Sequence, residues 1–173
     1  NATLKLATFY LLAKQTDESR KNVEAVLEKD PDNIEALFLM AGIYDMEKNL
    51  FEAAATFEKI LDLDPQQVRA RLGLARIYAR QGELDKAESQ LVRAVEMDPR
   101  AIKPRVDLAR FYMARKSFDK AQAQIEQAID SNPDNEDLYI ILGNFFYRMQ
   151  KPEEAENAYL KAIDISPKKA KPY

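Results

Sequence analysis

The sequence of 173 residues contains no cysteine and no histidine, and only 4 of its residues are glycine. Without cysteine there is no disulfide bond and no thiolate metal site. Without histidine the commonest general base is missing, and no serine has the usual partner of a catalytic triad. Neither of the glycine-rich phosphate-binding motifs, G-x-x-x-x-G-K-S/T and G-x-G-x-x-G, occurs. The sequence therefore predicts that the chain is not an enzyme and that it binds no cofactor and no metal.

Acidic residues are the remaining source of catalytic or metal-binding groups. The chain has 29 of them, so carboxylate-only chemistry and a hard-metal site stay open as alternatives. The dense acidic runs, however, such as Asp17-Glu18 and Glu153-Glu154, fall where we expect second helices to begin. Negative charge at that place complements the helix dipole, and this structural role is the interpretation we favour.

Long apolar runs and a strong net charge are missing as well. No apolar run approaches the roughly 18 to 20 residues that cross a bilayer, so we expect no direct insertion into a membrane. The formal net charge is -3, which argues against non-specific attraction of the whole chain to nucleic acid. With 46% hydrophobic and 32% charged residues, the composition is typical of a soluble, folded chain, and the scarcity of glycine favours an all-α one.

Proline marks an internal repeat of 34 residues. The prolines that stand at this spacing are Pro31, Pro65, Pro99, Pro133 and Pro167. Proline disfavours the helical conformation in the residue before it. We therefore expect a helix to end at each preceding residue, namely at Asp30, Asp64, Asp98, Asn132 and Ser166.

Small and large side chains recur with the same period. One small position is occupied by Ala7, Ala41, Ala75, Ala109 and Gly143, and the aromatic position three residues later by Tyr10, Tyr44, Tyr78, Tyr112 and Phe146. A second small position holds Ser19, Ala53, Ala87, Ala121 and Ala155, and the large position after it holds Val23, Phe57, Leu91, Ile125 and Tyr159. Such pairs let two helices approach closely. Each repeat should hold a first helix, such as residues 34–47, and a second helix, such as residues 51–63. Gly82 should cap a first helix, and Pro104 and Pro152 should lie near helix starts.

The period, the small and aromatic positions and the closing proline resemble the tetratricopeptide repeat (TPR). The resemblance covers a single array with repeats at 1–33, 34–67, 68–101, 102–135 and 136–169 and the start of a sixth at 170–173. It implies an all-α fold, a right-handed α-solenoid of helix-turn-helix repeats. The family's large aromatic near the start of each repeat is kept at Tyr139 and Tyr173 and replaced by Thr3, Leu37, Arg71 and Arg105. At those places we expect slightly looser packing, with arginine stems packed and guanidinium groups reaching water or a carboxylate.

The repeat pattern runs to both ends of the chain, since Asn1 falls at the second place of a repeat. We therefore expect the chain to be a segment of a longer protein. Solenoid ends normally carry a polar capping helix, and none is evident in the sequence. The terminal helices, including Tyr159 and Ile163, should then present apolar faces that favour end-to-end association.

The resemblance implies that first helices line a concave groove that holds a partner protein. One first-helix position is apolar in every repeat: Leu4, Phe38, Leu72, Val106 and Ile140. Packing between neighbouring first helices explains it equally well. Four residues on stand Thr8, Gly42, Arg76, Arg110 and Asn144, and three residues beyond those stand Leu11, Asp45, Ala79, Met113 and Tyr147.

Charge changes sign between the second and third repeats. Residues 34–67 carry 2 basic and 7 acidic side chains, net -5, whereas residues 68–101 carry 7 basic and 5 acidic ones, net +2. Arg69, Arg76 and Arg80 share a helix face by their spacing, and Lys103 and Arg110 repeat that placement one repeat later. A solvated face without function is the alternative. The residues we predict to bind a partner are Phe38, Asp45, Arg69, Leu72, Arg76, Arg80, Lys103, Val106, Arg110, Met113, Ile140, Asn144 and Tyr147.

These patterns predict a protein-protein interaction scaffold that holds an acidic, partly apolar segment of a partner within a multiprotein assembly. The lysine and asparagine set with which some family members hold a terminal carboxylate is missing. Alternatives are a structural, self-associating module and a regulatory array joined to an enzyme domain. Nucleic-acid binding is not expected, because Tyr147 alone is suitably placed to stack on a base. The repeats resemble those of bacterial envelope and secretion assemblies, and the compartment, cytoplasm or periplasm, stays open.

Overall fold

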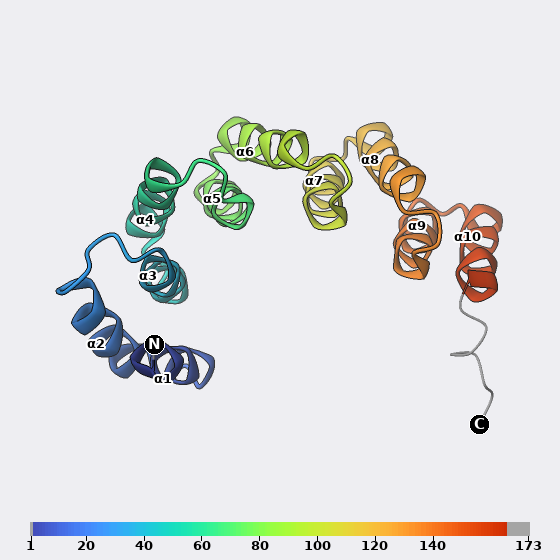
Figure 1. Cartoon of the computed structure of the whole chain (residues 1–173). Helices are drawn as coiled ribbons and strands as arrows, with labels where there is room; N and C mark the ends of the chain where they lie inside the picture. The colour runs from blue at the N-terminus through green and yellow to red at the C-terminus, as the bar shows by residue number, and fades with distance from the viewer. Residues whose placement is uncertain (1, 166–173) are drawn as a thin grey trace, which may run out of the picture. The chain divides into compact units, whose positions relative to one another are not determined.

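The computed structural model describes residues 2–165, and within them the chain forms ten α-helices and no strand (Figure 1). The helices are α1 (Ala2–Leu12), α2 (Thr16–Leu27), α3 (Ile34–Met46), α4 (Leu50–Leu63), α5 (Val68–Gln81), α6 (Leu84–Met97), α7 (Ile102–Ala114), α8 (Phe118–Ser131), α9 (Glu136–Arg148) and α10 (Pro152–Ile165). Each repeat is one helical hairpin, as its period predicts. The helix end predicted at Ser166 and the start of a sixth repeat at 170–173 lie outside the described residues.

The second helices before Pro65, Pro99 and Pro133 end where the sequence predicts. Both α4 and α8 stop one residue before the polar residue that precedes a proline. The first of these helices, α2, stops earlier, at Leu27, and a turn carries the chain on to Asp30. After the proline, Asn33 and Asn135 cap the next helix, because their side chains accept hydrogen bonds from the amides of Ala36 and Leu138 at 3.0 and 3.3 Å.

A left-handed residue stands at the same place in every hairpin turn. These residues are Lys14, Lys48, Gly82, Lys116 and Gln150, with φ between 58° and 83°. In each turn the left-handed residue donates to a carbonyl three residues back, and the next residue donates to a carbonyl five residues back, for example Asn49 to Tyr44 at 2.9 Å. This is the Schellman pattern of helix ends. The sequence predicted it only at Gly82, since glycine alone adopts this conformation without strain.

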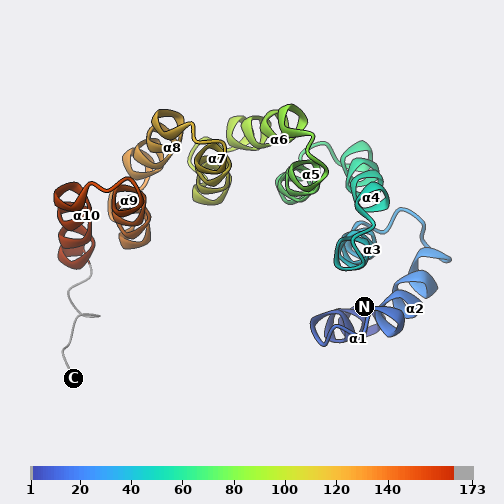
Figure 2. The same ribbon diagram turned by 180° about the vertical axis from the view of Figure 1, so that it is seen from behind.

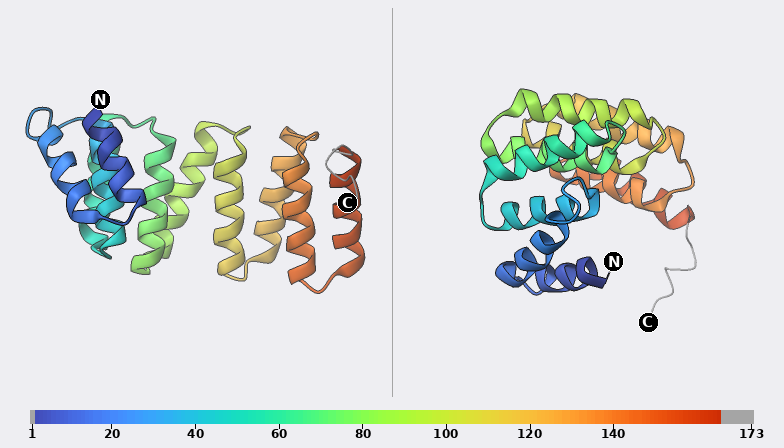
Figure 3. Two further views of the ribbon diagram at one scale, coloured as in Figure 1. Left: turned by 90° about the horizontal axis from the view of Figure 1, so that it is seen from below. Right: turned by 60° about the vertical axis from the view of Figure 1, so that its left-hand side comes forward.

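The chain divides into two units, Asn1–Met97 and Asp98–Tyr173. In unit 1 the hairpins α1/α2, α3/α4 and α5/α6 stack in chain order, and α2 and α4 each pack against the first helix that follows (Figures 1 and 2). The two helices of each hairpin run in opposite directions (Figure 3). The core of unit 1 is built from the predicted small and large positions, such as Ala41, Ala53 and Phe57. In unit 2, Val106, Ala128 and Leu138 form a cluster between α7, α8 and α9.

Two glycines of the first helices leave space for an aromatic ring of a second helix. A Cβ atom added at Gly143 would overlap the ring of Tyr159, and one added at Gly73 would lie 2.5 Å from the ring of Phe57. The Gly143 contact joins the small and large positions of one repeat, as the sequence predicts. The Gly73 contact joins α5 to α4 of the preceding repeat, and the sequence did not predict this contact. The signal that could have found it was a glycine inside a helix, which usually has a packing reason.

The two arginines that replace the family aromatic bind backbone and glutamine, not a carboxylate. Arg71 donates to the carbonyl of Pro65 at 2.9 Å and to Gln90 at 3.2 Å. Arg105 donates to the carbonyl of Pro99 at 3.0 Å and to Gln124 at 3.3 Å. The partners are 34 residues apart, so one local arrangement occurs in both repeats. Each guanidinium joins the loop before its first helix to the second helix of its hairpin.

Candidate protein-binding surface

Two arginines of α5 share one carboxylate of α3. Arg76 donates to Oδ2 of Asp45 at 2.6 Å, and Arg80 forms an ion pair with the other oxygen, Oδ1. The side chain of Asp45 is 10% exposed, whereas that of Arg76 is 58% exposed. The structure therefore brings together three of the predicted partner-binding residues, and two positive charges meet one negative charge there. Much of the Arg76 side chain stays open to solvent.

Arg69 and Phe38 form a second contact between α5 and α3. The Arg69 guanidinium carbon lies 4.2 Å from the centroid of the Phe38 ring, in cation–π geometry. The same ring meets Phe57 edge to face at 6.2 Å. Arg69 is exposed, and Phe38 and Leu72 are half-buried. The first helices of unit 1 thus carry exposed arginines beside partly exposed apolar side chains.

The predicted cations of α7, Lys103 and Arg110, are paired within their own helix. Lys103 lies 2.7 Å and Arg110 lies 3.5 Å from the two oxygens of Asp107, all on α7. Both cations are largely exposed, with 70% of the Arg110 side chain open to solvent. Met113, one turn further along α7, is half-buried.

The predicted residues of α9 differ in their surroundings. Ile140 and Tyr147 are exposed, and Asn144 accepts a hydrogen bond of 2.9 Å from the hydroxyl of Tyr159 on α10. Val106, at the same repeat position as Ile140, is buried against Ala128 and Leu138. The apolar first-helix position is therefore packed in some repeats and open in others. For Val106 the packing alternative of the sequence analysis describes the structure.

Tyr78 joins α5 to α4 of the preceding repeat. Its hydroxyl donates a short hydrogen bond to the carboxylate of Glu58. Burial and this bond to a carboxylate, which favours the protonated phenol, raise the pKa of Tyr78 to about 12. The sequence placed Tyr78 in the aromatic column of the core, but nothing in it indicated the partner on the preceding repeat.

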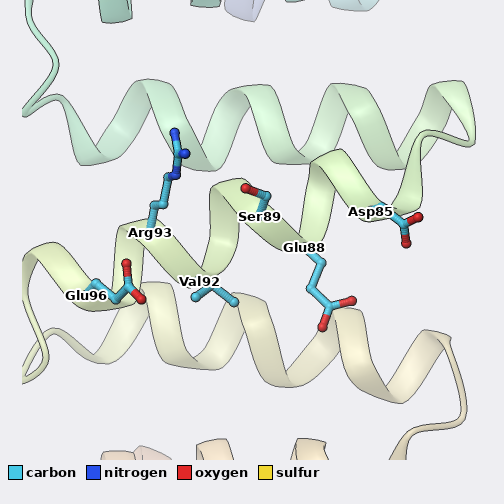
Figure 4. Close-up of a pocket in the computed structure, with 6 residues that line it drawn as sticks. All are labelled: Asp85, Glu88, Ser89, Val92, Arg93 and Glu96. Carbon is cyan, nitrogen blue, oxygen red and sulfur yellow. The ribbon is translucent and has the colours of Figure 1, made fainter.

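A surface depression of about 450 Å³ lies along α6, away from the predicted residues (Figure 4). Its lining residues are Asp85, Glu88, Ser89, Val92, Arg93 and Glu96. All of them come from one helix. Within residues 2–165 there is no group of three or more acidic side chains arranged to hold a metal ion. None of the helices described there is long and apolar enough to span a bilayer.

Two family models, both described as tetratricopeptide repeat, match the chain. One covers residues 46–100, and the other covers residues 4–68 and 106–170. The chain belongs to the tetratricopeptide repeat family. The ten helices of residues 2–165 and their hairpin turns are those of an all-α TPR fold. TPR proteins are typically scaffolds for protein-protein interaction and are generally not catalytic.

Solved TPR structures share this fold at low sequence identity. MamA is 22% identical, with a TM-score of 0.72 over 95% of this chain and 96% of the MamA chain. TTC0263, a thermophilic TPR protein of Thermus thermophilus, is 23% identical, with a TM-score of 0.72 over 96% of this chain and 91% of that one. YrrB, a TPR protein with an unusual peptide-binding site, is 21% identical, with a TM-score of 0.62 over 95% and 85% of the two chains. No curated protein sequence matches this chain.

Proposed function

We propose that this TPR chain is a non-catalytic scaffold that binds an acidic, partly apolar segment of another protein within a multiprotein assembly. The observation that carries the proposal is the excess of cations on α5. Arg76 and Arg80 share the single carboxylate of Asp45, and Arg69 lies on the ring of Phe38. A second carboxylate, supplied by a partner, would complete the charge balance at Arg76.

The apolar part of the segment is proposed to lie on the side chains beside these arginines. Phe38 and Leu72 are half-buried, so part of each remains open to a partner. An extended or helical segment that alternates acidic and apolar residues matches such a surface, because charge sets orientation while apolar contact adds affinity. The likeness of the fold to YrrB, a TPR protein with a peptide-binding site, supports peptide binding in general and assigns no residue here.

The surface of α7 is proposed as a second contact for acidic residues. Lys103 and Arg110 share Asp107, which again leaves two positive charges beside one negative charge. Their pairing is within one helix and solvent-exposed, where an ion pair contributes about 0.3–0.5 kcal/mol. A partner carboxylate would therefore displace Asp107 at little cost.

Fluorescence anisotropy with labelled peptides tests the proposal. One probe alternates aspartate or glutamate with leucine or phenylalanine, and its control carries lysine in place of every acidic residue. We expect the acidic probe alone to bind, with affinity that falls as salt is added. Arg76→Glu should weaken its binding roughly tenfold or more, and Arg110→Glu should weaken it less.

A matched control variant is Arg93→Glu, which makes the same charge change at an exposed place on α6. It should bind the acidic probe as the wild type does. Equal binding of the acidic and basic probes, or equal binding by wild type and the Arg76→Glu variant, would rule out the α5 surface.

A further inference from the structure

Two guanidinium groups of α5 are held in place along the face that α5 shares with α3. Arg69 lies over the ring of Phe38, and Arg76 binds the carboxylate of Asp45. Both contacts join residues 31 positions apart, so α3 and α5 run in the same direction and in step. Phe38 and Asp45 are seven residues apart on α3, as Arg69 and Arg76 are on α5. With a rise of about 1.5 Å per residue, the two positive charges stand about 10.5 Å apart along the helices.

The positive charge on this face exceeds the negative charge. Asp45 is shared by Arg76 and Arg80, and Arg80 also donates to the backbone carbonyl of Asp45 at 3.5 Å. Arg76 makes only the side-chain contact and is the more exposed of the two arginines. Arg69 is exposed, and among residues 2–165 no carboxylate pairs with it. A partner therefore meets two cations here, Arg69 and Arg76, each of which can take one carboxylate.

Between these two cations, α3 carries a residue without a side chain. Gly42 stands four residues after Phe38 and three before Asp45, so the three share one face of the helix. It is half-buried, and a Cβ atom added there would meet only the far end of Leu11, at 3.3 Å. An aromatic ring or a positive φ accounts for the other three glycines of the chain. A glycine inside a helix usually has a packing reason, and the flexible end of Leu11 does not supply one.

The spacing of the two cations distinguishes a helical partner from an extended one. On a helix, residues seven apart lie on one face and about 10.5 Å apart along the axis, which matches the cations. On an extended chain, residues on one face lie about 7 Å or about 13 Å apart. An extended segment that pairs with one cation would therefore miss the other by about 3 Å.

We propose, taking the proposed function as the starting point, that its acidic, partly apolar segment binds as a helix along α3 and α5. Two acidic residues of this helix, seven positions apart, pair with Arg69 and Arg76. An apolar residue between them, three or four positions after the first acid, lies over Gly42 and beside the half-buried Leu72. The missing side chain at Gly42 lets the partner helix approach α3 closely.

Fluorescence anisotropy with three labelled, alanine-rich peptides tests the spacing. The first has glutamates seven apart, with leucines three and four residues after the first glutamate. The second has the same composition with glutamates five apart, on nearly opposite sides of a helix. The third keeps the first spacing and has proline in the middle, which breaks the helix. We expect the first peptide to bind at least about tenfold more tightly than the other two. Equal binding of all three would overturn the proposal.

Charge reversal on the protein tests the contact with Arg69. Arg69→Glu should weaken binding of the first peptide about tenfold. Replacing one of the two glutamates of the peptide with lysine should restore its binding to this variant. The glutamate whose replacement restores binding gives the direction of the partner helix. Restoration by neither replacement contradicts the pairing. Arg93→Glu, the same charge change on α6, should bind the first peptide as the wild type does.

Filling the space at Gly42 tests the position of the partner helix. Gly42→Leu should weaken binding of the first peptide about tenfold or more, and Gly42→Ala should weaken it about threefold. Circular dichroism and urea denaturation show whether each variant is folded, and Gly42→Ala carries the test if Gly42→Leu is not. Folded variants that bind the first peptide as tightly as the wild type would exclude a partner helix over Gly42.

Failure of this proposal and failure of the proposed function give different results. If neither the first peptide nor the alternating acidic probe binds, the proposed function is wrong, and the helical segment with it. If the alternating probe binds the wild type, loses affinity in Arg76→Glu and binds as tightly as the first peptide, the proposed function stands and the helical segment is wrong.

Discussion

The third and fourth repeats place cations at the same positions, but the partners of these cations differ. In the third repeat, Arg76 reaches a carboxylate 31 residues back, Asp45 on α3. In the fourth repeat, Arg110 pairs with Asp107, three residues back on its own helix. The residue 34 places after Asp45 is Ala79, which has no charge to offer. The repeat position of an arginine therefore does not determine its ion-pair partner. The residue at the partner's position can differ from one repeat to the next, as Asp45 and Ala79 do.

The third and fourth repeats also differ one helical turn before Arg76 and Arg110. The third repeat has Gly73 where the fourth has Asp107, the residue that pairs with both cations of α7. Gly73 is required because the ring of Phe57 occupies the space of a side chain. In the third repeat, therefore, the preceding second helix fills this position.

Removing the carboxylate of Asp45 or that of Asp107 should give the largest difference in unfolding free energy between the two repeats. Asp45→Ala strips both ion pairs from a side chain that is 10% exposed, and we expect a loss of about 1.5–3 kcal/mol in the free energy of unfolding. Asp107→Ala removes exposed pairs within one helix and should cost no more than about 0.5 kcal/mol. Urea denaturation measures both. Equal losses in the two variants would mean that the ion pairs between α3 and α5 stabilise the fold no more than the ion pairs within α7.

Filling the space at Gly73 should have the next largest effect. Gly73→Ala drives a methyl group into the ring of Phe57, and overpacking of this kind costs about 1–3 kcal/mol. Gly42→Ala is the control, because its Cβ would meet only the flexible end of Leu11 at 3.3 Å. The double variant Gly73→Ala with Phe57→Leu should recover part of the loss. A Gly73→Ala variant as stable as wild type in urea denaturation would show that the ring moves aside freely.

Glycine in the strained turns should stabilise both repeats by a smaller amount. Lys48 has φ of 62° and Lys116 has φ of 58°, a conformation that costs a non-glycine residue about 1 kcal/mol. Lys48→Gly and Lys116→Gly should each raise the unfolding free energy by about 0.5–1 kcal/mol. The reverse change, Gly82→Lys, should lower it by a similar amount. If Gly82→Lys proved neutral in thermal or chemical unfolding, the turns would not be strained.

The smallest expected effect is the titration of Tyr78. Its pKa of about 12 lies above that of an unfolded tyrosine, so the stability it contributes is present below about pH 10 and is lost as the pH rises through 12. Ultraviolet difference titration should show a tyrosine that ionises late and disappears in Tyr78→Phe. Glu58→Gln should lower that pKa, although burial keeps it above the ordinary value. An unchanged late titration in Glu58→Gln would contradict the assigned hydrogen bond.

The sequence by itself determined the helices, most of their boundaries and their family. Proline at Pro65 and Pro99, the small positions and Gly82 act within a few residues or within one hairpin, so a periodic pattern suffices to reveal them. The left-handed conformations of Lys48 and Lys116 were not predicted, because lysine rarely adopts a positive φ and nothing in the sequence marks these two positions.

Only the tertiary structure decided which side chains meet across repeats. Asp45 with Arg76, Phe57 with Gly73 and Tyr78 with Glu58 join residues 16 to 31 positions apart, and stacking of hairpins sets those distances. The same holds for exposure, since Val106 and Ile140 are both apolar at one repeat position, yet only Val106 is buried, in a cluster with Ala128 and Leu138. Side chains become core, charge partner or open surface according to what the neighbouring repeat supplies.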